Sequence, residues 1–260
     1  NPKPLERTQN WIKLGGNVKE SKVQHGSYSH PVRHEMRGLL ESSQHGVGGV
    51  MGSRSGDDIN ISPKYKVERW KALRLDNNNP VENDWNTAVD ILNDPITERF
   101  LKPAQYLINA PFEGSQPTFG FAILALDFMV IETTQGFKEG KIKHNNGVSS
   151  QLFGKFCSAS EPFTRSVCHP LTNEDAARNL YSQGRCAMHH KGSTEALIVG
   201  VTGDMISFGE DATIRVIRTE FHEQVADEFK RYLAELRNPA SSDLREKFKI
   251  KMSSICGMPQ

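Results

Sequence analysis

The stretch from Phe119 to Glu132 most constrains the fold of this 260-residue chain, because its side chains are apolar on nearly every side of a helix. A helix on a protein surface carries its apolar residues along one stripe, whereas a helix that is apolar all round is buried. We therefore expect this segment to be the central buried helix of a helical domain. Gly136 and Gly140 mark its expected end.

The same apolar region is too short to span a membrane. Its uncharged run between Glu113 and Asp127 has 13 residues, and a spanning helix needs about 20. The sequence begins without an apolar signal segment, and its four cysteines form no C-x-x-C pair of the kind that binds structural zinc. We therefore predict a cytoplasmic protein with free thiols and no membrane contact.

Charge and composition change along the chain. The whole sequence has 32 Lys plus Arg and 31 Asp plus Glu, a balance that excludes a broad basic surface for nucleic acid. Residues 1–80 contain 13 basic and 8 acidic residues, and only 22 of the 80 are hydrophobic. We predict that residues 1–80 form a polar, Gly-rich arm or small extension, and that residues 81–260 form the helical domain.

Apolar periodicity predicts further helices on both sides of the central segment. They cover residues 85–92, 94–107, 149–156, 173–190, 221–233 and 244–252. Pro95 is expected to break the first of them, with Asp94 capping the next. The strand-like stretches 196–201, 205–208 and 213–217 alternate with turn residues. The prediction is a mainly α fold with a small β-hairpin insertion.

Two acidic residues, Asp127 and Glu132, interrupt the central apolar segment. Burial of a carboxylate is costly unless the group is protonated or paired. Each acid therefore has a structural partner, such as a helix cap or an arginine, or it lines a functional site.

A second cluster of reactive side chains, Arg185, His189 and His190, lies near the end of the predicted helix 173–190. An arginine can hold a phosphate with two N–H donors and stabilise developing negative charge. A histidine exchanges protons near neutral pH. Together these groups suit cleavage of a phosphodiester without a metal. The motifs of dinucleotide enzymes, P-loop NTPases, zincins and α/β-hydrolases are absent from the sequence.

The stretch Arg185-Cys186-Ala187-Met188-His189-His190 fits the R-x4-H pattern of the HEPN domains (higher eukaryotes and prokaryotes nucleotide-binding). The order of the other segments also resembles a group of bacterial HEPN proteins, over about residues 82–256. These segments are W-x-x-A-x-x-I-L at 85–92, Arg-Phe-Leu at 99–101, the G-F-A-x-x-A-L-D-x-x-x-I-E-T helix at 120–133, the Tyr-x-x-x-Arg-Cys helix at 181–186 and Phe-x-x-Tyr-x-x-x-Leu at 229–236.

HEPN domains are all-α helical bundles, often dimeric, and many are metal-independent ribonucleases in toxin–antitoxin and phage-defence systems. The resemblance implies an RNA substrate, a homodimer, a protein partner such as an antitoxin, and neither cofactor nor metal. It implies that Arg185 holds the scissile phosphate and that His190 moves the protons. Tyr181 stands four residues before Arg185 and shares its helix face. We further expect Glu132 to pair with Arg185.

The second histidine leaves an alternative open. In an ideal helix Arg185 and His189 lie about 40° apart, whereas Arg185 and His190 lie about 140° apart. Geometry therefore favours His189 and the motif favours His190. A distorted helix, or a cleft between two copies, would reconcile them.

Two other functions are compatible with the sequence. The chain could be a non-catalytic HEPN module that binds a nucleotide, RNA or a protein, with Arg185 in a structural role. The family often has Asn, Asp or His after the arginine, where this chain has Cys186. A metal-dependent hydrolase that uses His189 and His190 is the third hypothesis.

Overall fold

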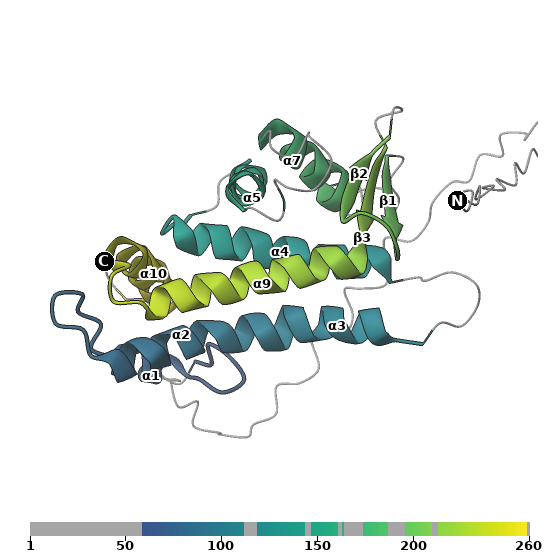
Figure 1. Cartoon of the computed structure of the whole chain (residues 1–260). Coiled ribbons are helices and arrows are strands. Elements are labelled where there is room, and N and C mark those ends of the chain that lie inside the picture. Colours follow the sequence, from purple (N-terminus) through teal and green to yellow (C-terminus); the bar gives the residue numbers. More distant parts are fainter. Residues whose placement is uncertain are drawn as a thin grey trace, which may run out of the picture. The chain divides into compact units, whose positions relative to one another are not determined.

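The structure is a computed structural model, which describes residues 59–111, 119–143, 147–160, 163, 174–186, 196–209 and 213–258. Its described part is mainly α-helical and includes a small three-stranded sheet (Figure 1). The helices are α1 (Val67–Lys71), α2 (Glu82–Ile96), α3 (Lys102–Asn109), α4 (Gly120–Lys138), α5 (Val148–Ala159), α7 (Glu174–Tyr181), α9 (Arg218–Arg237) and α10 (Ser242–Ile255). Two π-helical segments, η2 (Thr97–Leu101) and η4 (Ser182–Cys186), follow α2 and α7 directly.

The predicted central helix is α4, and its position confirms the prediction. It contacts α9 on one side and α5 and η4 on the other, and Figure 1 shows it between α9 and the α5–α7 pair. Among the described helices only α4 has the length and composition to cross a membrane, but 61% of its most apolar 18-residue window is buried inside the protein. Fully buried residues such as Phe128 and Ile131 place α4 in the hydrophobic core.

The helix that begins at Glu82 does not break at Pro95, contrary to the prediction. It continues through the π-helical segment η2 into α3. Proline removes one backbone N–H and crowds the preceding turn, and a π-helical turn is one way for a helix to absorb such a disturbance without ending. Asp94 is buried inside the helix and does not cap it. Its carboxylate accepts a hydrogen bond of 3.1 Å from the backbone N–H of Lys64.

The helical unit begins before residue 81, where the sequence analysis placed its boundary. Val67 and Trp70 of α1 are buried in the same core as Trp85. The rings of Trp70 and of Phe248 on α10 pack edge to face, with their centroids 5.6 Å apart. The apolar content of residues 1–80 is low on average, and this average did not reveal the packed segment that contains α1. The described residues of that range therefore belong to the helical unit.

The three predicted strands form one mixed sheet in the order β1-β3-β2. They are β1 (Leu197–Gly200), β2 (Ile206–Phe208) and β3 (Ile214–Ile217). Strands β2 and β3 make the predicted antiparallel hairpin, and β1 pairs with β3 in parallel. Strand β3 runs directly into α9, and Val199 of β1 packs against Gly120 at the start of α4. The sheet is thereby attached to the two helices that carry the sites described below.

Candidate active site on the central helix

The two acidic side chains that interrupt the apolar helix point to different sides of α4. Asp127 and Glu132 have exposed fractions of 0% and 7%. Five residues along an α-helix correspond to a rotation of about 140° around its axis. Asp127 meets His222 on α9, whereas Glu132 meets Arg185 on η4.

The predicted pairing of Glu132 with Arg185 is confirmed. An Nη1 hydrogen of Arg185 is donated to Oε1 of Glu132, and the two side chains form an ion pair. The Glu132 side chain is 9% exposed and the Arg185 side chain is 43% exposed. The acid is therefore nearly buried while its partner reaches the surface. A charge-assisted hydrogen bond of this kind restrains the position of the guanidinium group.

Tyr181 supports the same guanidinium from a second direction. The Arg185 guanidinium carbon lies 5.8 Å from the centroid of the Tyr181 ring, close enough for a cation–π attraction. Tyr181 is itself 6% exposed, and its ring packs against Phe128 and Phe153. Arg185 is thus held by a nearly buried acid of α4 and by an aromatic ring of the hydrophobic core.

Gly184 brings the motif segment close to α4, and the sequence analysis did not single it out. A Cβ atom at this position would overlap the ring of Phe128, which is fully buried. Only glycine therefore permits η4 to approach α4 closely enough for Arg185 to reach Glu132. The available signal was an isolated glycine inside a helical pattern, which commonly has a packing reason.

Both histidines of the motif, His189 and His190, lie outside the described residues. The described part of η4 ends at the backbone of Cys186, and the Cys186 side chain is not included. The structure therefore brings together Glu132, Tyr181 and Arg185 of the predicted site. The assignments of His189 and His190 stay predictions.

Asp127 has a partner that the sequence analysis did not identify. Oδ1 of Asp127 lies 2.7 Å from Nδ1 of His222, and the two side chains are 0% and 4% exposed. Burial raises the pKa of Asp127 to about 6, although the hydrogen bond and the charge of His222 act in the opposite direction. The partner of Asp127 is neither a helix cap nor an arginine, the two structural partners that we considered.

A weak sequence signal for His222 existed. It falls on the apolar stripe of the predicted helix 221–233, at helical spacing from Val225, Phe229 and Leu233. A histidine on a buried stripe needs a polar partner. Nothing in the sequence says which residue that partner is, because 95 positions separate the two members of the pair.

No described group of three or more His, Cys, Asp or Glu side chains could hold a metal ion. Comparisons with protein-family models, curated proteins and solved structures find no match to the chain. The chemistry of the site is therefore inferred from its own side chains. Of the described site residues, Arg185 is the one whose side chain is exposed to solvent, and its Nε and Nη2 atoms have no hydrogen bond to a described residue.

Proposed function

We propose that the chain is a metal-independent endoribonuclease of the HEPN type, in which Arg185 and His190 cleave RNA phosphodiesters in a cleft between two copies. One observation carries the proposal. Arg185 is half-exposed, and its guanidinium is held by Glu132 and Tyr181. A fixed guanidinium at a protein surface is a preorganised site for a phosphate, because little entropy is lost when the anion binds.

The proposed reaction assigns a separate task to each residue. The 2′-hydroxyl oxygen attacks the adjacent phosphorus, so that an O2′–P bond forms as the P–O5′ bond breaks. The 2′-hydroxyl loses a proton and the departing 5′ oxygen gains one, and His190 supplies this proton exchange. Arg185 holds the negative charge that builds up on the phosphate oxygens. The products are a 2′,3′-cyclic phosphate and a 5′-hydroxyl end.

Segment η4 is π-helical from Ser182 to Cys186, so the helix that carries Arg185 is distorted there. His189 and His190 lie outside the described residues. The choice of His190 as the partner of Arg185 therefore rests on the R-x4-H motif.

A face of α4 offers a surface for the second copy. Phe121 and Met129 are 37% and 40% exposed, and Ala122 and Ala125 beside them are exposed too. These positions recur at helical spacing, so they form one apolar stripe on the helix that also carries Glu132. Apolar side chains that recur along one exposed helix face are typical of a protein interface. We propose this stripe as the contact of a homodimer whose cleft contains Arg185 of both copies.

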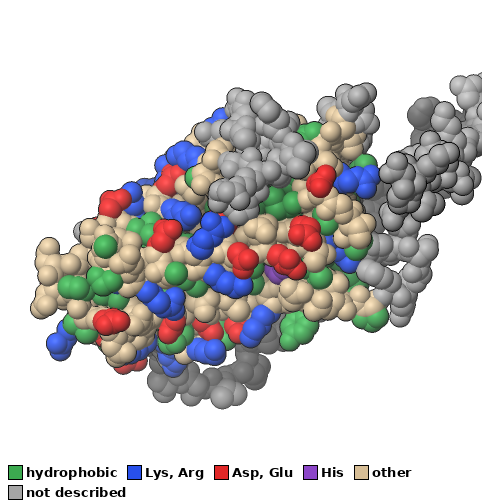
Figure 2. Space-filling view, in the orientation of Figure 1, with side chains coloured by type: hydrophobic (Ala, Val, Ile, Leu, Met, Phe, Trp, Pro, Cys, Tyr) green, Lys and Arg blue, Asp and Glu red, His purple; other side chains and the backbone are tan. Residues whose placement is uncertain are grey.

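The distribution of charge is compatible with a small phosphate site. Figure 2 shows Lys and Arg side chains interspersed with Asp and Glu over the face that it presents, without a broad basic patch. Binding to RNA would then depend on a few phosphate contacts at the cleft. We expect the enzyme to act on cytoplasmic RNA, in a toxin or phage-defence system with a protein partner such as an antitoxin.

The ion pair with Glu132 also favours a second candidate function. It neutralises the charge of Arg185, which would weaken stabilisation of a transition state. On this reading the chain is a non-catalytic HEPN module that binds a nucleotide, RNA or a protein, and Arg185 fastens η4 to α4.

The two functions are separated by incubating the purified chain with labelled RNA in the presence of EDTA. The proposal predicts cleavage that resists the chelator and that Arg185→Ala and His190→Ala each abolish. Cleavage that survives both substitutions would overturn it. Retained RNA binding without cleavage would support the non-catalytic module. Loss of cleavage on adding EDTA would point to a metal-dependent hydrolase.

A further inference from the structure

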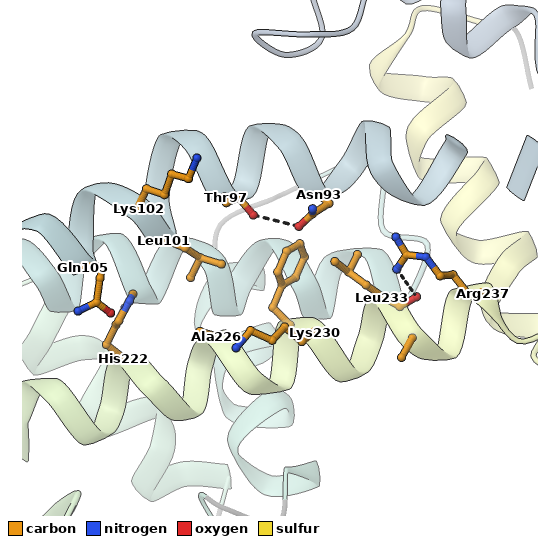
Figure 3. A pocket seen from close by; sticks show the side chains of 12 residues that line it. Asn93, Thr97, Leu101, Lys102, Gln105, His222, Ala226, Lys230, Leu233 and Arg237 are labelled. Carbon is orange, nitrogen blue, oxygen red and sulfur yellow. Dashed lines mark hydrogen bonds between the residues drawn. The ribbon is translucent and has the colours of Figure 1, made fainter. Parts of the chain in front are cut away.

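A groove that is separate from the Arg185 site lies between α9 and the continuous helix formed by α2, η2 and α3 (Figure 3). Its volume is about 550 Å³, and small-molecule sites usually have volumes of about 300–1,000 Å³. Its apolar lining comes from both walls and consists of Leu101, Ala226, Phe229, Leu233 and Ala234. A ligand that fills this groove therefore needs an apolar body.

The charged side chains at this groove are already neutralised by their neighbours. Lys102, Lys230 and Arg237 line it, and they pair at 2.6, 2.8 and 2.7 Å with acids that do not line it. Figure 3 shows Lys102 directed away from α9. An anion would have to compete with these acids, and a cation would meet three positive side chains. The groove therefore favours an uncharged ligand.

His222 presents a buried hydrogen-bond acceptor to this groove. Its exposed fraction is 3%, and Figure 3 shows its ring at the same end of the groove as Gln105. Nδ1 of the ring lies 2.7 Å from Oδ1 of Asp127. A carboxylate in this position keeps the ring hydrogen on Nδ1 and leaves the lone pair on Nε2. No described residue donates a hydrogen bond to Nε2.

The free lone pair on Nε2 of His222 favours a ligand that donates a hydrogen bond. A buried acceptor without a donor has lost its hydrogen bond with water and has gained none in return. A carboxylate or a phosphate would turn another acceptor toward Nε2, whereas a hydroxyl group turns a donor toward it. A hydroxyl is also an uncharged donor that brings little polar surface into an apolar groove.

We infer that this groove binds an uncharged molecule with an apolar body and one hydroxyl group, a phenol or an alcohol. The body lies against Phe229 and Leu233, and the hydroxyl donates its hydrogen to Nε2 of His222. The hydrogen bond with Asp127 orients the imidazole ring for this contact. The inference does not depend on the proposed ribonuclease, because no described residue of the Arg185 site lines the groove.

The test compares two ligands that differ only at the hydroxyl group. 4-Butylphenol has the donor, and its methyl ether, 4-butylanisole, has the same apolar body without it. Binding to the purified full chain is measured by calorimetry at pH 8, where Asp127, with a pKa of about 6, is ionised. We expect one phenol per chain and an affinity about tenfold higher than that of the ether, because the ether leaves the buried acceptor without a donor.

A substitution then locates the bound phenol. Ala226→Trp fills the groove without a change of charge and should weaken phenol binding at least tenfold. The matched control is Ala240→Trp, because Ala240 is exposed just after α9 and does not line the groove. This control should change the affinity less than twofold.

Nuclear magnetic resonance reads the proposed hydrogen bond directly, with His222 left in place. Its replacement would leave Asp127 buried without a partner, which is strongly destabilising. In the wild type labelled with ¹⁵N, the Nε2 resonance of His222 should move upfield on addition of the phenol, as expected for a nitrogen that accepts a hydrogen bond. The ether should leave this resonance in place.

Three results would overturn the inference. They are equal affinities for the phenol and its ether, phenol binding that Ala226→Trp leaves unchanged, and tighter binding of the anion 4-butylbenzoate than of the phenol. A repeat with 1-octanol and its methyl ether shows which body the groove accepts. Tighter binding of the phenol assigns an aromatic body, and tighter binding of the alcohol assigns an aliphatic one. Saturable binding of neither hydroxyl compound would also overturn the inference.

Discussion

The two acids of α4 face opposite environments, although they belong to one helix and are five residues apart. Glu132 holds Arg185, whose side chain is 43% exposed, whereas Asp127 holds His222, whose side chain is 4% exposed. In the first pair, the positively charged Arg185 side chain lies at the surface. The second keeps both partners in the core.

The difference shows how burial changes the task of an ion pair. A buried pair is costly to desolvate and costly to break, and its clearest effect is on the stability of the fold and its pH dependence. A pair with one exposed partner loses less hydration and keeps a cation available to a ligand. The predictions below test this contrast, first on the Asp127 side, then at the contact that joins η4 to α4, then on the Glu132 side.

The largest effect on stability is expected for Asp127→Asn. The pKa of Asp127 is about 6 in the folded protein and about 4 in the unfolded chain. As the pH rises from 4 to 6, the unfolded chain loses a proton that the folded protein retains, so the wild type loses stability. Asparagine does not titrate. The free energy of unfolding of the variant should therefore rise relative to that of the wild type by on the order of 2 kcal/mol over this range.

Urea unfolding at pH 4, 5, 6 and 7 measures this change. Asp94→Asn is a control of opposite sign. Burial raises the pKa of Asp94, but hydrogen bonds from Ser62 and Lys64 lower it overall, so wild-type Asp94 adds stability as the pH rises. A constant free-energy difference between Asp127→Asn and the wild type at all four pH values would refute the prediction.

The next effect is expected for Gly184→Ala. Alanine in a helix normally stabilises relative to glycine by up to about 1 kcal/mol. Here the added methyl group would overlap the buried Phe128 ring, so we expect a loss of about 2 kcal/mol in the free energy of unfolding. Displacement of η4 should also separate Arg185 from Glu132 and reduce RNA cleavage.

Ser182→Ala provides the matched control for Gly184→Ala. Ser182 belongs to the same π-helical segment and is exposed, so its replacement should change the stability by less than about 0.5 kcal/mol. Urea unfolding of the two variants decides the matter. A Gly184→Ala variant that is more stable than the wild type would contradict the prediction, because it would show that the added methyl group does not clash with Phe128.

The smallest effect is expected for Glu132→Gln, which keeps the size of the side chain and removes its charge. We expect RNA cleavage to fall about tenfold, or about 1.4 kcal/mol in transition-state stabilisation, because Arg185 loses its fixed direction. Glu132→Asp keeps the charge and should recover part of the rate. Glu228→Gln changes a similarly buried acid paired with Arg231 and should leave the cleavage rate unchanged.

Local patterns in the sequence predicted a large part of this structure. The all-round apolar character of residues 119–132 predicted the central position of α4, because such a helix must be buried. The spacing of four residues placed Tyr181 and Arg185 on one face. The need of a buried carboxylate for a partner led to the pairing of Glu132 with Arg185. Each inference uses helical periodicity or the cost of burying charge.

The remaining features depend on contacts between distant segments or on exceptions to local rules. Asp127 and His222 are 95 positions apart, and no local pattern connects them. Pro95 reads as a helix break, but η2 absorbs the disturbance and the helix continues. Trp70 belongs to the core, although its neighbours in the sequence are polar enough to suggest an arm.

The cleavage of labelled RNA by Arg185→Ala, beside Arg231→Ala, tests the central claim most directly. Both arginines are about half exposed and both pair with a nearly buried glutamate, so loss of an ion pair as such affects them equally. With EDTA present, we predict that the rate falls at least 100-fold in Arg185→Ala and changes less than twofold in Arg231→Ala. Equal rates for the two variants would contradict the account.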